Sequence, residues 1–269
     1  TGEIWLRVPE TIRIEINGEL PANVMSKDVI LRIIGDLTAA GATYRALEFI
    51  GDTVEAMSLS SRMTMANMGI EAGAKCALFA PDEKTAEYLG IELTDAERAL
   101  AGDADAPCEK VLRYRAEDFV PVMALPSNVD HVAAIRDLEP VDIDQVFLGS
   151  CTNGRLEDLM AAAEILKGKH IAPFVKLIVT PASRKIWEEA EANGTLATLS
   201  AAGAMITHPS CGLCCGRTGG ILSDGERVVA TNNRNFLGRM GSSKVEIYLA
   251  SPKSAAASAL TGRLTEAAC

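Results

Sequence analysis

The chain has 269 residues, of which 48% are hydrophobic and 23% charged, and its formal net charge at pH 7 is -10. Such a composition predicts a folded globular protein with one large or two modest domains. The acidic balance argues against a general nucleic-acid binder, because no basic field would attract a phosphate backbone. No apolar run approaches the roughly 20 residues that cross a bilayer, and no signal-peptide order is seen, so we expect no membrane span and a cytoplasmic location.

The first part of the chain alternates strand-like and helical patterns. Thr11 to Ile16 reads as a strand. Apolar residues then recur at helical spacing after Ser26, which is a plausible N-cap. Further strands are expected at Ala46 to Ile50 and at Cys76 to Phe79. Alternation of this kind favours a layered α/β fold.

The same alternation returns later in the chain. We expect strands at Val146 to Gly149, Val175 to Val179 and Val245 to Leu249, and helices at about Leu156 to Leu166, Ser183 to Ala192 and Ser254 to Leu260. The intervening stretch Ala101 to Pro107 is rich in Ala, Gly and Asp, as surface loops are. It predicts a boundary between a domain over residues 1–105 and a second over residues 110–269.

Cysteine usage points away from a disulfide scaffold. The seven cysteines are an odd number, in a chain with enough apolar residues to build a core without covalent cross-links. Metal or cluster ligation is therefore the better interpretation. The cysteines are Cys76, Cys108, Cys151, Cys211, Cys214, Cys215 and Cys269.

Cys151 follows a strand of the buried type and precedes a helix, in Phe147-Leu148-Gly149-Ser150-Cys151-Thr152-Asn153-Gly154. Ligand sites in open α/β sheets lie at the carboxyl ends of strands, so this cysteine stands where a functional group is expected. Taken alone, a buried structural cysteine would be the more common explanation.

Cys211 and Cys214 form a Cys-x-x-Cys turn among glycines and a proline. This spacing lets two thiolates face one centre, which suits zinc or an iron–sulfur cluster. Zinc is a serious alternative, because His208 or Cys215 could complete a tetrahedron with the three cysteines. A redox dithiol fits less well, because the motif does not open a helix in a thioredoxin-like setting.

Two polar groups of residues accompany the cysteines. Asn67 and Glu71 are spaced i and i+4 in a helix-forming stretch and would share one face amid apolar and glycine-rich surroundings. Arg234 and Arg239 lie five positions apart in a polar loop with a glycine. Guanidinium groups match carboxylates well, although surface arginines are usually only solvated.

With these residues in place, the chain resembles the aconitase superfamily, and within it the branch of 3-isopropylmalate dehydratase and homoaconitase large subunits. One matching stretch runs from Gly149 to Asn153 with Leu156, and another from Gly203 to Cys214. Asn232 to Arg239 and Met68 to Ala74 add two more. The resemblance implies layered α/β/α domains of the type of aconitase domains 2 and 3.

Carried over residue by residue, the resemblance implies that Cys151, Cys211 and Cys214 bind a 4Fe–4S cluster. It implies that Asn67 and Asn233 form hydrogen bonds near that cluster. Glu71 matches a glutamate beside the open iron and the substrate hydroxyl. Arg234 and Arg239 match arginines that hold substrate carboxylates. Cys215 stands where the family usually has an aliphatic residue, and we expect it to lie beside the ligands without being one.

The chain departs from the family pattern at its start. The family's N-terminal region, with its catalytic histidines, has no counterpart here, so we expect a truncated and inactive chain. In this branch the last domain, which carries the serine base, lies on a separate small subunit, which is the expected partner. The implied activity is reversible dehydration and rehydration that interconverts 2-isopropylmalate and 3-isopropylmalate in leucine biosynthesis.

Other functions share parts of this pattern. Homoaconitase, aconitase and 2,3-dimethylmalate dehydratase would use the same site residues on other hydroxy acids. A zinc-stabilised binding module would use the Cys-x-x-Cys turn alone, because a structural zinc site does not need Asn67, Glu71, Arg234 and Arg239. We expect no nucleic acid or membrane partner.

Overall fold

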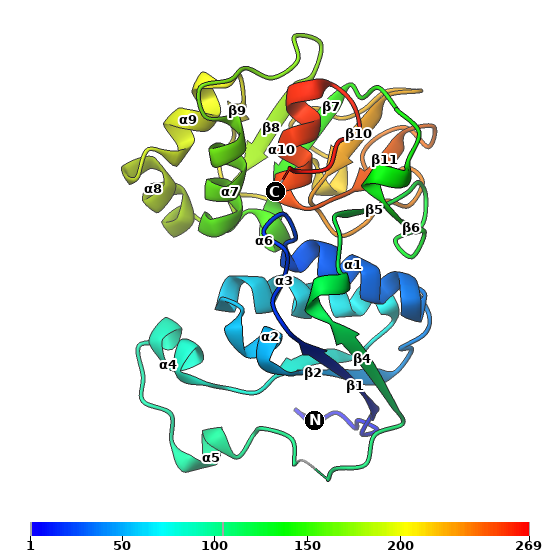
Figure 1. Ribbon diagram of the computed structural model, residues 1–269, viewed down its shortest axis with the longest axis vertical. Helices are drawn as coiled ribbons and strands as arrows, with labels where there is room; N and C mark the ends of the chain where they lie inside the picture. The colour runs from blue at the N-terminus through cyan, green and yellow to red at the C-terminus, as the bar shows by residue number, and fades with distance from the viewer. Residues whose placement is uncertain (1, 104, 269) are drawn as a thin grey trace.

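A computed structural model describes residues 2–103 and 105–268, which form two lobes stacked along the long axis of the molecule (Figure 1). The elements of the first lobe are β1 (Glu10–Asn17), α1 (Ser26–Leu37), β2 (Arg45–Ile50), α2 (Asp52–Ala56), α3 (Leu59–Met68), the 3-10 helix η1 (Gly69–Ala72), β3 (Cys76–Phe79), α4 (Glu83–Leu89), α5 (Asp95–Arg98) and β4 (Lys110–Arg115).

The first lobe is built on a parallel sheet with the strand order β3-β2-β1-β4 among the described residues. On β1, Ile12, Ile14 and Ile16 are buried towards α1 and α3, which lie between this sheet and the second lobe (Figure 1). The alternate positions are charged, and Arg13 pairs with Glu48 of β2 at 2.7 Å. A helix packed on the charged face of this sheet would bury those charges at a high cost in free energy. The long helices therefore cover only the apolar face, and the lobe has two main layers.

Strand β4 corrects the expected domain boundary. It pairs in parallel with β1, with Ile12 opposite Lys110 and Asn17 opposite Arg115. Residues 110–115 therefore belong to the first sheet, and the chain passes to the second lobe after β4. The loop that suggested a boundary at residues 105–110 is a crossover within the first lobe, and its Ala104 lies outside the described residues.

The second lobe contains the remaining elements. They are η2 (Ala116–Asp118), β5 (Val122–Ala124), β6 (Val132–Ala134), η3 (Ile135–Asp137), β7 (Gln145–Gly149), α6 (Ser150–Asn153), α7 (Leu156–Leu166), β8 (Lys176–Thr180), α8 (Arg184–Ala192), α9 (Thr195–Ala201), β9 (Met205–Ile206), η4 (Gly212–Cys215), β10 (Arg227–Ala230), β11 (Glu246–Leu249) and α10 (Pro252–Thr261).

The sheet of the second lobe has the order β6-β5-β11-β10-β7-β8-β9 within the described part of the chain. Its central strands are parallel, and β5 runs antiparallel to β11 and β6. One face packs on α7, α9 and α10 through Val146 and Leu148 of β7. The prediction of layered α/β domains is confirmed, and the predicted strands and helices of both lobes agree with the structure to within one or two residues.

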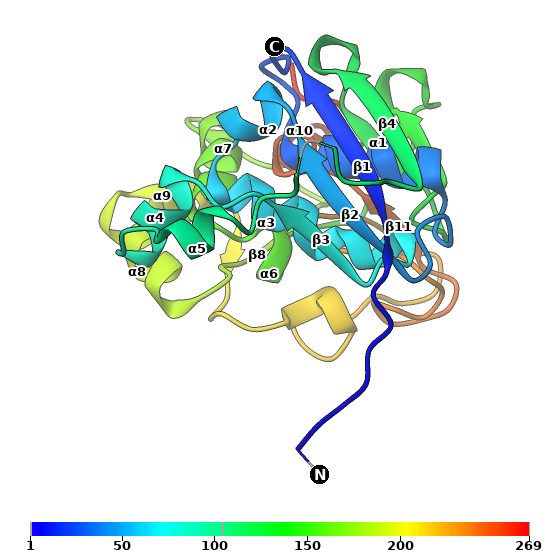
Figure 2. The same cartoon turned by 90° about the horizontal axis from the view of Figure 1, so that it is seen from below.

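The opposite face of the second sheet belongs to a core that both lobes share. Phe147 of β7 and Ile178 of β8 are buried in the same cluster as Ile30 of α1 and Met65 of α3. Residues 2–9 lead away from this body as an extended arm, seen from below in Figure 2. The helices that the structure describes include none long and apolar enough to cross a membrane.

Two local predictions were wrong. Helix α1 begins at Ser26 and its N-cap is Met25, whose backbone N–H donates to the Asp28 carboxylate at 2.9 Å. Asn67 and Glu71 do not share one α-helix, because α3 ends at Met68 and Glu71 lies in η1. Gly69 is the first residue of η1. Its backbone lies so close to the Ala77 side chain that a Cβ on residue 69 would clash with it.

Candidate functional site

Cys151 stands at a sharp turn after strand β7. Gly149 has φ 135° and Ser150 has φ 70°, so the chain turns through two left-handed residues before the short helix α6. A Cβ on Gly149 would meet the Thr180 carbonyl oxygen of β8 at 2.0 Å. The turn therefore depends on glycine, and it leaves the Cys151 side chain exposed beside the first lobe.

Cys211 and Cys214 lie at the start of and within the 3-10 helix η4. The Cys214 N–H donates to the Cys211 carbonyl at 3.0 Å, and the Gly212 N–H donates to Ser210 Oγ at 3.0 Å. Gly216 ends the turn with φ 64°. The six cysteines within residues 2–103 and 105–268 are all free thiols, and Cys269 lies outside the described residues.

The predicted ligands share one electrostatic neighbourhood. Burial is the main cause that raises the pKa of Cys211 above its ordinary value of 9.0, and the charges of Cys214, Cys215 and Cys151 raise it further. Within the described ranges, no three His, Cys, Asp or Glu side chains form a set for a single metal ion. The Cys151 turn and the η4 turn thus lie close enough for their charges to interact, but their side chains form no single-ion site.

Asn67 and Asn233 approach Cys151 through a threonine. Asn67 Nδ2 lies 3.6 Å from Cys151 Sγ and donates to Thr152 Oγ1 at 2.9 Å. The Thr152 hydroxyl donates in turn to Asn233 Oδ1. This chain of hydrogen bonds joins α3 of the first lobe, α6 and the loop after β10.

Arg239 lies beside the other end of the thiol group. Its Nη2 donates to Cys214 Sγ at 3.5 Å, and its guanidinium lies 5.5 Å from the centroid of the Phe236 ring. Its Nε is buried and has no hydrogen-bond partner among the residues described. A buried guanidinium N–H without a partner can donate a hydrogen bond to an anionic ligand, because most of its own desolvation cost has already been incurred.

Arg234 and Glu71 form an ion pair across the two lobes. Arg234 Nε donates to Glu71 Oε1 at 2.8 Å. The side chain of Glu71 is 11% exposed, whereas that of Arg234 is 43% exposed. Glu71 is therefore held in place, while the outer edge of the Arg234 guanidinium faces solvent.

The remaining candidates lie outside this arrangement. Cys215 donates to the Gly212 carbonyl at 3.8 Å. His208 stacks beside Trp187, with 6.2 Å between the ring centroids. Among the described residues, neither side chain belongs to a group of three that could hold a metal ion, so the alternative that used either as a fourth zinc ligand gains no support.

Sequence reasoning missed three residues of the site. Thr152 links the two asparagines, and its place next to Cys151 was the signal that could have found it. Buried Asn232 donates through Nδ2 to the Arg234 carbonyl at 3.0 Å. Lys27, near the start of α1, is fully buried although it is a lysine.

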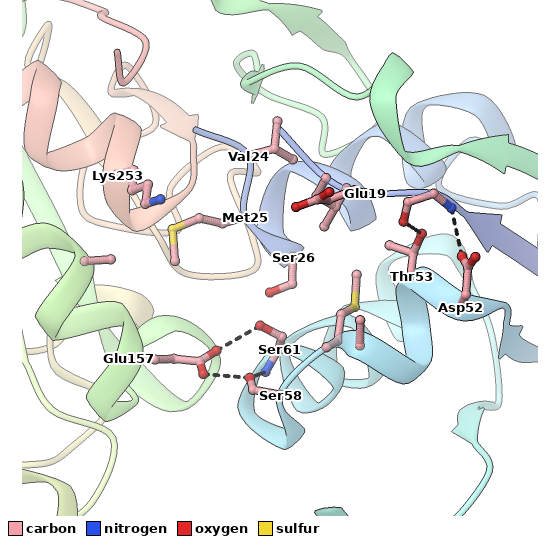
Figure 3. A pocket seen from close by; sticks show the side chains of 15 residues that line it. Glu19, Val24, Met25, Ser26, Asp52, Thr53, Ser58, Ser61, Glu157 and Lys253 are labelled. Carbon is pink, nitrogen blue, oxygen red and sulfur yellow. Dashed lines mark hydrogen bonds between the residues drawn. The ribbon is translucent and has the colours of Figure 1, made fainter. Parts of the chain in front are cut away.

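A hollow of about 740 Å³ lies elsewhere between the lobes (Figure 3). Glu157 of α7 accepts there from Ser58 Oγ at 2.6 Å and Ser61 Oγ at 2.8 Å. None of the predicted site residues lines it. Its hydrogen bonds join the two lobes.

Fold and site together define a two-lobed α/β protein with a thiol site between its lobes, where amide and guanidinium donors face the sulfurs. A model of the aconitase family (aconitate hydratase) matches residues 1–142 and 133–262, and the chain belongs to that family.

Two curated relatives are both named as 3-isopropylmalate dehydratase large subunits. The chain is 49% identical over 266 residues to 3-isopropylmalate dehydratase large subunit 1 of Methanopyrus kandleri. The matched region covers 99% of this chain and 64% of that protein. It is 47% identical to large subunit 2 of Archaeoglobus fulgidus, over 98% of this chain and 64% of that protein. The chain thus spans less than two thirds of the length of these relatives.

The fold of the chain was also compared with solved structures. The holo-form of aconitase X from Thermococcus kodakaraensis has a TM-score of 0.47 and 14% sequence identity, over 88% of this chain and 53% of that one.

Proposed function

We propose that this chain carries the cluster-binding part of a 3-isopropylmalate dehydratase large subunit. Membership of the aconitase family and the names of the relatives imply an iron–sulfur cluster. In this proposal Cys151, Cys211 and Cys214 each bind one iron of a 4Fe–4S cluster. The observation that carries it is that N–H donors of Asn67 and Arg239 contact the free thiols of Cys151 and Cys214.

The donor set fits such a cluster. Thiolates are the usual protein ligands of iron–sulfur clusters, and N–H groups directed at the sulfurs stabilise their negative charge. Each thiolate of a cluster binds its own iron, so the three sulfurs need not converge on one ion as zinc ligands must. The free thiols of Cys151 and Cys214, each with an N–H donor beside its sulfur, support this assignment.

The chain's own residues would bind and orient a hydroxy dicarboxylate. A bound cluster with three cysteine ligands would supply an iron with open coordination positions, which acts as a Lewis acid on a hydroxyl group. Arg239, with its unpartnered Nε, and Arg234, with its exposed edge, would each hold a carboxylate. Glu71, fixed by Arg234, would accept a hydrogen bond from the substrate hydroxyl.

The proposed reaction removes water from 2-isopropylmalate and adds it back to give 3-isopropylmalate. The relatives are named large subunits, which implies a separate small subunit, and we place the base that takes the carbon-bound proton on that partner. Homoaconitase, aconitase and 2,3-dimethylmalate dehydratase activity would use the same groups of this chain. A full-length large subunit with its small subunit, assayed on each hydroxy acid, should act most efficiently on isopropylmalate.

The cluster assignment is tested by anaerobic reconstitution of the chain with iron and sulfide. We expect bound iron, acid-labile sulfide and a broad absorption near the blue edge of the visible spectrum. Cys214→Ser should lose the absorption, whereas Cys76→Ser, which changes an exposed thiol on β3, should keep it. Stoichiometric zinc without labile sulfide would contradict the proposal and favour a zinc-stabilised binding module.

A further inference from the structure

Lys27 of α1 is a fully buried lysine whose ammonium group reaches into the other lobe. Its Nζ donates to the carbonyl oxygen of Thr231 at 3.0 Å and to that of Asn232 at 2.7 Å. Removing an ammonium group from water costs several kcal/mol, of which these two hydrogen bonds recover only a part. Burying a lysine at this position therefore lowers the stability of the fold. Its presence points to a role for the backbone that it holds.

The backbone that Lys27 holds connects the β10 strand to the site. Thr231 Oγ1 accepts from the Gly149 N–H at 2.8 Å, at the turn that presents Cys151. The next residue but one is Asn233, which accepts from Thr152. Lys27 thus binds the backbone of Thr231 and Asn232. That backbone is connected both to the Cys151 turn, through Thr231, and to Asn233.

Lys27 also lies within electrostatic reach of the site. Burial is the main cause that lowers its pKa to about 7, and the charges of Asp158, Cys214, Glu71 and Asp28 act against that shift. Two of these groups, Cys214 and Glu71, are predicted site residues. The neutral amine keeps two N–H donors, so both carbonyls can be bound in either protonation state.

We propose that Lys27 is a positioning residue of the cysteine site. From the first lobe, it fixes the Thr231–Asn232 backbone of the second lobe, so that Asn233 and Arg234 face Cys151 and Glu71. Without its amino group two buried carbonyls would lose their donor, and the loop would move to reach water. This inference deepens the proposed function and rests on it for the role of the site.

A second lysine provides a matched control. Lys253 of α10 also joins the two lobes, because its Nζ donates to the Ala22 carbonyl at 2.6 Å. It is only half-buried and lines the hollow of Figure 3, away from the cysteines. Lys253→Met removes a bond between the lobes without touching the site, and Leu47→Ala weakens the fully buried core of the first sheet.

The experiment compares Lys27→Met with both controls by two measurements. The first is the rate at which iodoacetamide alkylates Cys151 in the metal-free chain, read by mass spectrometry against exposed Cys76 as internal reference. The second is the affinity of the reconstituted chain for malate, used as a simple hydroxy dicarboxylate. We expect Lys27→Met to change the Cys151 rate and to weaken malate binding about tenfold, whereas both controls keep the wild-type values.

The results separate positioning from stability and from the proposed function. Wild-type alkylation and affinity in folded Lys27→Met would overturn the proposal, as would equal changes in Leu47→Ala. Should Lys27→Met not fold, Lys27→Gln decides, because its side chain is one bond shorter and cannot bring its nitrogen within hydrogen-bond distance of both carbonyls. Unchanged malate affinity in that variant would refute the proposal. A wild-type chain that takes up no cluster would refute the proposed function, and the alkylation rates would still test Lys27.

Discussion

Thr152 sets the orientation of both asparagines at the site. A hydroxyl has one proton, so a hydroxyl that donates to Asn233 Oδ1 must accept from Asn67 Nδ2. The amide group of Asn233 then turns its own N–H donors away from Thr152. Two side chains from different lobes are thereby fixed without a direct contact, and Asn67 Nδ2 also lies 3.6 Å from Cys151 Sγ.

Asp158 makes the stability of the protein depend on pH. It is buried at the start of α7, where it accepts from Asn153 Nδ2 and from the Arg155 N–H, both at 3.1 Å. Burial raises its pKa from 3.8 to about 7 in spite of these bonds. The folded state holds the proton more tightly than the unfolded state, so this contribution to stability is full at low pH and is lost as pH rises towards 7.

We therefore expect Asp158→Asn to show a smaller loss of stability than the wild type between about pH 4 and about pH 7. The measurement is the urea midpoint at a series of pH values. Asp28 is also buried with its pKa raised to about 7, so part of the decline should remain in the variant. An identical pH dependence in both proteins would contradict the assignment.

At the scale of elements, the junction of β7 and α6 depends on a single glycine. Gly149→Ala must place a methyl group 2.0 Å from the Thr180 carbonyl oxygen, in a backbone conformation that L side chains rarely adopt. We expect a loss of more than about 3 kcal/mol in the free energy of unfolding, measured in urea. Gly168→Ala is the matched control, since its φ is 70° but no atom lies within 4 Å of the added carbon.

Gly168→Ala should lower the free energy of unfolding by about 1 kcal/mol, because only the strain of the left-handed conformation is added. Similar losses in the two variants would show that the approach of β8 does not constrain the turn. The comparison measures what the turn adds to ordinary left-handed strain, namely the glycine-only backbone conformation of Gly149 and the close approach of β8.

At the scale of the molecule, the shared core predicts that both lobes unfold together. Leu47 is fully buried in β2, and its cluster extends to Phe147 and Ile178 of the second sheet. We expect Leu47→Ala to lower the free energy of unfolding by about 2–5 kcal/mol in a single transition.

The probe for this prediction is the fluorescence of Trp187, which lies on α8 of the second lobe. The exposed Trp5 is first replaced by Phe to remove its signal. Trp187 fluorescence and far-ultraviolet circular dichroism should report the same urea midpoint, shifted together by Leu47→Ala. Two separate transitions, with only one of them shifted, would mean that the lobes unfold independently.

The sequence alone determined many of the strands and helices and the family of this protein. Strand and helix periods are local, because Ile12, Ile14 and Ile16 alternate wherever the strand is placed. The cysteine stretches, together with Met68 to Ala74 and Asn232 to Arg239, likewise indicated the family before any contact was known. Such features need only neighbouring residues or the residue types themselves.

The tertiary structure decided which residues meet. Lys27 looks like an ordinary helical lysine until α1 is packed against the end of β10, and Thr152 becomes a link only when two lobes bring Asn67 and Asn233 to it. The place of β4 in the first sheet also depended on pairing with a strand about 100 residues earlier. Contacts between distant segments depend on packing, which no local pattern records.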